Sequence, residues 1–214
     1  MQGVSRPVFT AFRLALGGDW GTLLLQARNR LLGIDLSEIT ANELGLAEGS
    51  ADHNASQERR LVALLRQLPI THQDAILDLG CGKGAALIAF HQLPFGRITG
   101  VELSPELTEI CRENLRRLRQ SATEVVCADA REFRDLDAFT YVYLFNPFGA
   151  AILEAVLENL TASLQRAPRP FTLLYYNPVH AGLLARHGFV EERRFEQSDG
   201  HPTIAYAYQP SPGA

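Results

Sequence analysis

The spacing of apolar residues along the chain changes near residue 70. Before that point the pattern is helical: residues 8–46 form a leucine-rich stretch that glycines interrupt, and a second helix is expected from residue 54 or 56 to residue 68. In this second helix leucines recur at intervals of three and four, and Pro69 ends it. The first part of the chain is therefore predicted to be helical throughout.

Beyond residue 70, short apolar runs alternate with helical stretches. Strands are expected at residues 75–79, 97–103, 123–127, 140–145 and 171–176, and helices follow the first, second and fourth of them. The helix after the second strand opens on Ser104 as N-cap with Pro105 at its first position. Strands that alternate with helices indicate a parallel sheet with right-handed crossovers.

The C-terminal part has a different pattern. Residues 189–196 and 203–208 flank Ser198-Asp199-Gly200, a turn sequence typical of an antiparallel hairpin. The predicted fold is therefore a doubly wound α/β domain with a mostly parallel seven-stranded sheet, an antiparallel C-terminal hairpin and an N-terminal helical segment. We place a helical cap segment at residues 1–53, the α/β domain at residues 54–209 and a tail at residues 210–214.

Composition and charge narrow the class of protein. Of the 214 residues, 46% are apolar and 21% charged, and the net charge of −4 does not favour nucleic acid as a partner. The three cysteines form no CxxC pair, which favours a reducing cytoplasm and predicts no metal site. No stretch approaches the roughly 18 apolar residues of a membrane helix, so a cytoplasmic enzyme or binding protein is expected.

The strongest motif lies between the first predicted strand and its helix. It reads Asp78-Leu79-Gly80-Cys81-Gly82-Lys83-Gly84. Glycines let the backbone turn tightly and approach a ligand closely, and a helix N-terminus offers unpaired N–H groups. The spacing of Gly80, Gly82 and Ala85 also satisfies the dinucleotide fingerprint. The motif alone therefore leaves an adenosine cofactor and NAD both open.

Polar side chains follow the next three strands where each one ends. Glu102 lies 22 residues beyond Gly80 and could accept both hydroxyls of a ribose, in NAD or in another adenosine cofactor. Asp129 could receive the amine of adenine or could merely cap a turn. Asn146 is held extended by Pro147. Open α/β sheets bind their ligands at this edge, and Tyr175-Tyr176 ends the fifth strand as a candidate pocket wall.

Together these features resemble the class I methyltransferase family over residues 54–209. The resemblance implies S-adenosyl-L-methionine as cofactor, with residues in three places to hold it. These are Asp78, Gly80, Cys81, Gly82 and Gly84 in the glycine-rich loop, Glu102 and Leu103 at the ribose, and Asp129 and Ala130 at the adenine. The amino-acid sequence of the loop is also similar to that of the non-SET histone-lysine methyltransferases and their small bacterial relatives.

Asn146-Pro147-Phe148 is similar to the Asn-Pro-Pro-aromatic tetrapeptide of amino-group methyltransferases, although the second proline is missing. This resemblance implies that Asn146, Pro147 and Phe148 are catalytic residues, with Asn146 also against the cofactor. The expected function is methyl transfer to a nitrogen of a protein side chain or small molecule. An NAD-dependent oxidoreductase and an inactive cofactor-binding module stay open as alternatives. Residues 8–46 are expected to cover the acceptor site, or else to pack on a flank or form a dimer contact.

Overall fold

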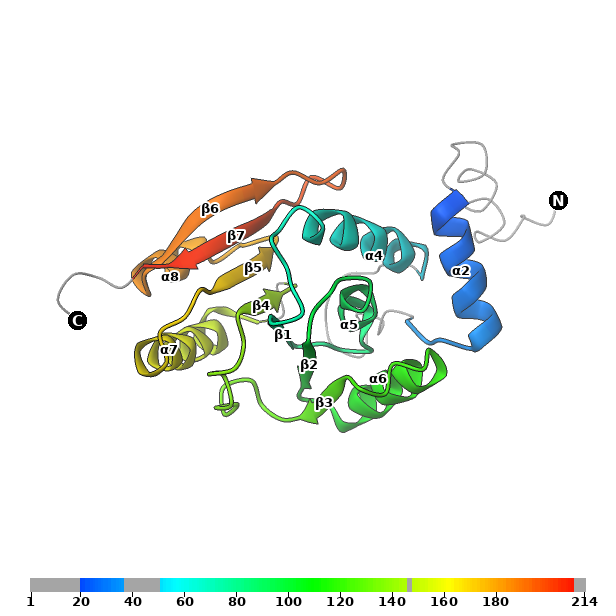
Figure 1. Ribbon diagram of the computed structural model, residues 1–214, viewed down its shortest axis with the longest axis horizontal. Coiled ribbons are helices and arrows are strands. Elements are labelled where there is room, and N and C mark those ends of the chain that lie inside the picture. The colour runs from blue at the N-terminus through cyan, green and yellow to red at the C-terminus, as the bar shows by residue number, and fades with distance from the viewer. Residues whose placement is uncertain (1–19, 37–50, 146–147, 210–214) are drawn as a thin grey trace.

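A computed structural model describes residues 20–36, 51–145 and 148–209 (Figure 1). Its centre is a seven-stranded sheet in the order β3-β2-β1-β4-β5-β7-β6. The first five strands are parallel, and β7 runs antiparallel to both β5 and β6. The strands are β1 Ala75–Leu79, β2 Arg97–Glu102, β3 Glu124–Cys127, β4 Tyr141–Leu144, β5 Thr172–Tyr176, β6 Phe189–Phe195 and β7 Thr203–Tyr208. The predicted fold class is thereby confirmed.

Helices cover both faces of the sheet (Figure 1). α4, α5 and α6 pack on one face, and α7 and α8 pack on the other. Residues of β4 alternate between the two layers: Tyr141 and Tyr143 belong to the first, and Val142 and Leu144 to the second. A parallel strand that is covered on both faces reads as a continuous apolar run, which is the pattern of β4. The helices are α2 Trp20–Leu32, α4 Ala51–Leu65, α5 Ala85–Phe90, α6 Pro105–Arg117, α7 Ala150–Arg166 and α8 Ala181–Arg186.

Element boundaries differ from the predicted ones at a few places. α4 begins at Ala51, three residues before the earliest predicted start, so the boundary predicted between residues 53 and 54 falls inside this helix. The six-residue α8 was not predicted, because its single buried leucine, Leu184, gives no helical period. β6 carries a register shift between Glu191 and Arg193, which the alternation of side chains does not reveal.

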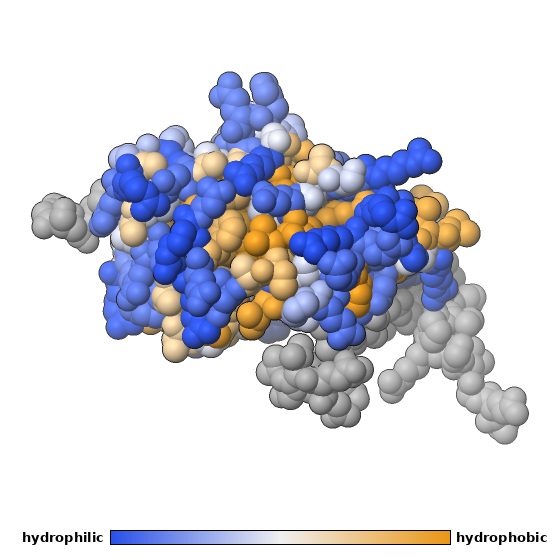
Figure 2. Space-filling model, turned by 90° about the horizontal axis from the view of Figure 1, so that it is seen from below, coloured by the Kyte–Doolittle hydropathy of each residue, from blue (hydrophilic) through white to orange (hydrophobic). Residues whose placement is uncertain are grey.

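The described part of the N-terminal segment packs against α4. α2 ends at Leu32, and Gly33 directly after it has a positive φ of 64°, which closes the helix. Arg28 forms an ion pair with Glu58 of α4 at 3.2 Å. Another side of α2 exposes Trp20, Leu24 and Leu31, and apolar surface is visible at this end of the molecule in Figure 2. α2 thus packs beside α4 at one end of the molecule (Figure 1).

Along the described ranges, no helix has both the length and the apolar character that a membrane crossing demands.

Candidate active site

The glycine loop, residues 80–84, connects β1 to α5 at the carboxyl edge of the sheet. β1 lies between β2 and β4 in the sheet, so this loop occupies the point where the strand order reverses. Gly84 has φ 87°, and a Cβ there would come within 2.6 Å of Cys111 Sγ. Gly82 has φ 52°, and a Cβ there would meet no atom within 4 Å. The loop is therefore packed against α6 at Gly84 and open at Gly82, as a ligand that approaches the backbone would need.

Glu102 at the end of β2 fastens this loop. Its Oε2 accepts a hydrogen bond from the N–H of Gly82 at 2.9 Å, and its Oε1 accepts one from the N–H of Ser104 at 2.9 Å. The carboxylate is 9% exposed. Each carboxylate oxygen keeps a second lone pair, so Glu102 can hold the loop and still accept hydroxyl groups.

Leu103 and Asp129 extend the edge towards β3. Leu103, directly after β2, is 67% exposed. Asp129 Oδ1 accepts the backbone N–H of Arg131 at 2.8 Å, and hydrogen bonds from the Arg131 side chain lower the pKa of Asp129. Ala130 is buried beside them. The turn role of Asp129 is thus visible, while adenine binding by Asp129 stays a prediction.

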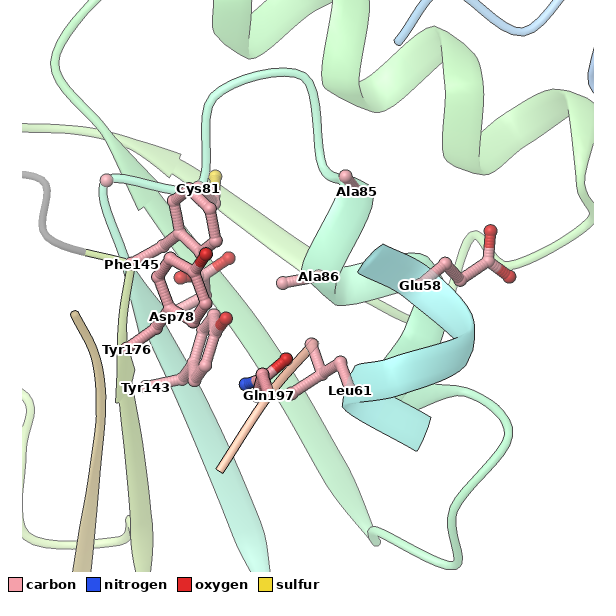
Figure 3. A pocket seen from close by; sticks show the side chains of 11 residues that line it. Glu58, Leu61, Asp78, Cys81, Ala85, Ala86, Tyr143, Phe145, Tyr176 and Gln197 are labelled. Carbon is pink, nitrogen blue, oxygen red and sulfur yellow. The ribbon is translucent and has the colours of Figure 1, made fainter. Parts of the chain in front are cut away.

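A cavity of about 160 Å³ lies next to the glycine loop, over the ends of β1, β4 and β5. In Figure 3 its aromatic side chains and Asp78 gather on one side, with α4 and α5 across from them. The rings of Phe145 and Tyr176 are stacked, with centroids 4.3 Å apart and planes 5° apart. The cavity is lined by Glu58, Leu61, Asp78, Gly80, Cys81, Ala85, Ala86, Tyr143, Phe145, Tyr176 and Gln197.

Asp78 is the acidic group of this cavity. It is 3% exposed, and no hydrogen bond to its carboxyl group lowers its pKa. Burial, and then the nearby charge of Glu102, raise the pKa of Asp78 to about 8. The nearby Cys81 thiol is kept neutral, because a hydrogen bond with Cys111 and burial both raise its pKa. Near neutral pH the cavity therefore contains a carboxyl group that can gain or lose its proton.

The loop between β6 and β7 closes one side of the cavity. Gln197 of this loop lines the cavity. The hydroxyl of Tyr176 donates to Asp199 Oδ2 at 3.1 Å, and Arg60 of α4 lies 3.3 Å from the same oxygen. The C-terminal hairpin is therefore attached both to β5 and to α4 above the site.

Of the three predicted acceptor residues, the structure describes only Phe148. Asn146 and Pro147 lie outside the described residues. Phe148 is half-buried and packs against the apolar layer on the α7 face, and it is not among the residues that line the cavity. The ring that lines it is Phe145, three positions earlier. The catalytic roles assigned to Asn146, Pro147 and Phe148 stay predictions.

Sequence reasoning missed Tyr143, Phe145 and Glu58. The sequence did contain a signal for Tyr143. Tyrosines alternate with Val142 and Leu144 in β4, and this alternation places the tyrosines on one face of the strand. The part of the expected cap segment that the structure describes, residues 20–36, does not reach the cavity. Glu58 and Leu61 of α4 line the cavity, whereas no residue of the described 20–36 stretch does. Covering of the acceptor site by the rest of residues 8–46 stays a prediction.

Comparison with known proteins points to a methyltransferase domain. Residues 76–170 match the family model described as a methyltransferase domain. A trans-aconitate 2-methyltransferase of Escherichia coli O157:H7 is 32% identical over 90 residues, which are 42% of this chain and 34% of that protein. The chain therefore covers about a third of the length of that relative. It covers 24% of a ribosomal protein L11 methyltransferase of Pelobacter propionicus.

Solved structures share the fold over most of the chain. A ribosomal protein L11 methylase from Lactobacillus delbrueckii subsp. bulgaricus superposes with a TM-score of 0.60 at 18% identity, covering 78% of this chain and 83% of that one. An RNA methyltransferase from Salinibacter ruber, in complex with S-adenosyl-L-homocysteine, gives 0.52 at 19% identity, covering 74% and 95%. Residues 76–170 thus match a methyltransferase domain, and the sheet around them has the fold of these solved methyltransferases. The match and the neighbour that holds S-adenosyl-L-homocysteine indicate S-adenosylmethionine as the cofactor.

Within the described residues, no three His, Cys, Asp or Glu side chains are grouped in a way that would hold a metal ion.

Proposed function

We propose that this protein transfers a methyl group from S-adenosylmethionine to an acceptor bound in the aromatic cavity, and that the acceptor atom is a nitrogen of a small molecule or protein side chain. The observation that carries the proposal is the juxtaposition of two features. A glycine loop open at Gly82 and tied to Glu102 adjoins a cavity with Asp78 and three aromatic rings.

The residues at the sheet edge suit the parts of the cofactor. Glu102 would accept the ribose hydroxyls, the exposed Leu103 would lie against the adenine, and Asp129 would receive its amine. Asp78 would accept the ammonium of the methionine part, because a cation beside it favours its ionised form. When bound, the cofactor supplies an activated methyl group on a sulfonium centre.

The aromatic side of the cavity would hold the acceptor. The faces of Tyr143, Phe145 and Tyr176 carry negative electrostatic potential and attract a positive centre, by about 0.5–2 kcal/mol per contact. Methyl transfer asks mainly for alignment of the two reacting atoms, which can supply about 7–11 kcal/mol of the barrier in well-oriented systems. A small, rigid and largely apolar cavity suits that requirement.

The cofactor assignment predicts a clear preference in binding. Purified protein should bind S-adenosylhomocysteine with micromolar or tighter affinity and should bind NAD at least about tenfold more weakly, because no second feature beyond the glycine spacing favours NAD. Isothermal titration calorimetry with each ligand measures this. Tighter binding of NAD would contradict the proposal. Cofactor binding with no turnover across amine, carboxylate and protein acceptors, followed with radiolabelled S-adenosylmethionine, would favour the inactive module.

The acceptor assignment makes Phe145 the residue to change. Phe145→Ala should lower kcat/KM for the acceptor by at least about tenfold, because it removes both a ring face and the stack on Tyr176. Affinity for S-adenosylhomocysteine should change by less than threefold, about 0.65 kcal/mol. Phe145→Tyr keeps the ring and should retain most activity. If cofactor affinity and kcat/KM fall by the same factor, Phe145 contacts the cofactor and not the acceptor.

A further inference from the structure

The side-chain amide of Asn114 on α6 joins the glycine loop to the segment that follows α2. Asn114 is 1% exposed, and its Oδ1 accepts the N–H of Asp35 at 2.9 Å. Its Nδ2 donates to the carbonyl of Asp35 at 2.7 Å and to the carbonyl of Lys83 at 3.0 Å. Both backbone groups of Asp35 are thus bound by one amide, as they would be by a neighbouring strand.

Lys83 lies between the two fixed points of the glycine loop. On one side Gly82 is held by Glu102, and on the other Gly84 packs directly on Cys111. The ammonium of Lys83 also lies 2.9 Å from Asp35 Oδ2, and its side chain is 13% exposed. The loop is therefore anchored from β2 through Glu102 and from α6 and Asp35 through Lys83.

Residues 33–36 in turn are continuous with α2. The N–H of Ile34 donates to the carbonyl of Asn29 at 2.8 Å, and Arg117 of α6 donates to the carbonyls of Leu32 and Gly33. Ile34 and Leu36 pack against the apolar layer that includes α5 and α6. Asn114 therefore connects the glycine loop to the segment that follows α2.

We propose that Asn114 is a positioning residue for the cofactor loop and that it couples cofactor binding to the docking of α2 and residues 33–36. This inference rests on the proposed cofactor function. Coupling between two sites is reciprocal. A ligand that orders residues 80–84 must therefore hold residues 33–36 more firmly, and loss of their contact must weaken the ligand by the same factor.

Asn114→Asp tests the proposal because it keeps the size of the side chain and replaces the amide donors with an acceptor facing two carbonyls. Three results are expected. Amide hydrogen exchange in residues 80–84 becomes faster without any ligand. Affinity for S-adenosylhomocysteine falls about tenfold. Tryptic cleavage after the exposed Arg30 should be slowed by the ligand in the unchanged protein and should not be slowed in the variant.

Two further variants separate positioning from general stability. Asp35→Pro removes the N–H bound by Asn114 from an exposed residue, outside the core of the domain, and should reproduce all three results. Ser163→Ala is the matched control. It removes a fully buried hydroxyl on α7 that bonds Asp137 at 2.7 Å. It should lower stability and leave the exchange of residues 80–84 and the ligand affinity unchanged.

The outcomes are distinguishable. The coupling is overturned if both Asn114→Asp and Asp35→Pro bind the ligand within twofold of the Ser163→Ala affinity. It is also overturned if the ligand still protects Arg30 from trypsin in both variants. The proposed cofactor function stands in either case. Failure of the unchanged protein to bind S-adenosylhomocysteine would overturn the proposed function and the coupling with it. Faster exchange in the ligand-free variants would then still assign Asn114 to holding the loop.

Discussion

Replacing Glu102 with alanine should lower the affinity for S-adenosylhomocysteine about a hundredfold and reduce the thermal stability of the protein. The carboxylate accepts hydrogen bonds from the N–H groups of Gly82 and Ser104. Hydrogen bonds to a charged group contribute about 1.5–3 kcal/mol each. The substitution removes both of them as well as the proposed contact with the ribose, so the ligand loses a partner and the loop loses its anchor.

Calorimetry and a thermal melt of the same sample measure the two effects. Glu102→Gln keeps one acceptor oxygen and should give an intermediate loss of affinity. Glu124→Ala is the control: this carboxylate is exposed, lies on the neighbouring β3 and pairs with Arg97, so its loss should leave the affinity unchanged. A Glu102→Ala protein that binds the ligand normally would assign Glu102 to the loop alone.

The position of Glu102 was readable from the sequence, because it follows an apolar run at a fixed distance from the glycine loop. The same reasoning predicted every strand of the sheet to within two residues, since buried parallel strands are short apolar runs between turn residues. The antiparallel hairpin was equally visible in the alternation of Ile204 and Tyr206 with the intervening alanines. Local patterns of this kind are sufficient to predict the order and type of the elements of the domain.

The composition of the cavity was not readable in the same way. Phe145 stacks on Tyr176 because β4 and β5 are adjacent with Leu144 opposite Tyr175, and that register is known only once the sheet is assembled. Tyr176 was expected in the pocket wall together with Tyr175, yet Tyr175 lies in the layer on the opposite face. Asn114 gave no signal at all, because its partners are 31 and 79 residues away in the chain.

The second large effect concerns Asp78 and the dependence of stability on pH. Its pKa is raised from 3.8 to about 8 in the folded protein. Between these values the native state keeps a proton that the unfolded chain has released. The contribution of the protonated Asp78 to the free energy of unfolding is therefore fully present below about pH 4. It is lost as pH rises to about 8, at up to about 1.4 kcal/mol per pH unit.

Asp78→Asn removes this titration without changing the size of the side chain. The variant should lose no stability relative to the unchanged protein near pH 5. At pH 8.5 it should be relatively more stable, by on the order of 3–4 kcal/mol compared with the difference at pH 5. Urea unfolding of both proteins at a series of pH values measures the effect. Asp137→Asn is the control, because the pKa of Asp137 is lowered to about 2 by hydrogen bonds from Arg166 and Ser163, so its titration lies outside this range.

The same carboxyl group connects stability with the proposed cofactor site. If the ammonium of the methionine part binds beside Asp78, the ligand favours the ionised carboxylate, and binding at pH 7 should release up to one proton. Calorimetric titration of S-adenosylhomocysteine in buffers of different ionisation enthalpy counts that proton. Asp78→Asn should bind more weakly and should release none from this site. A contradicting outcome is a pair of parallel stability curves between pH 5 and 8.5 with equal proton release on binding. It would mean that Asp78 is ionised throughout this range and that burial and the charge of Glu102 do not raise its pKa into it.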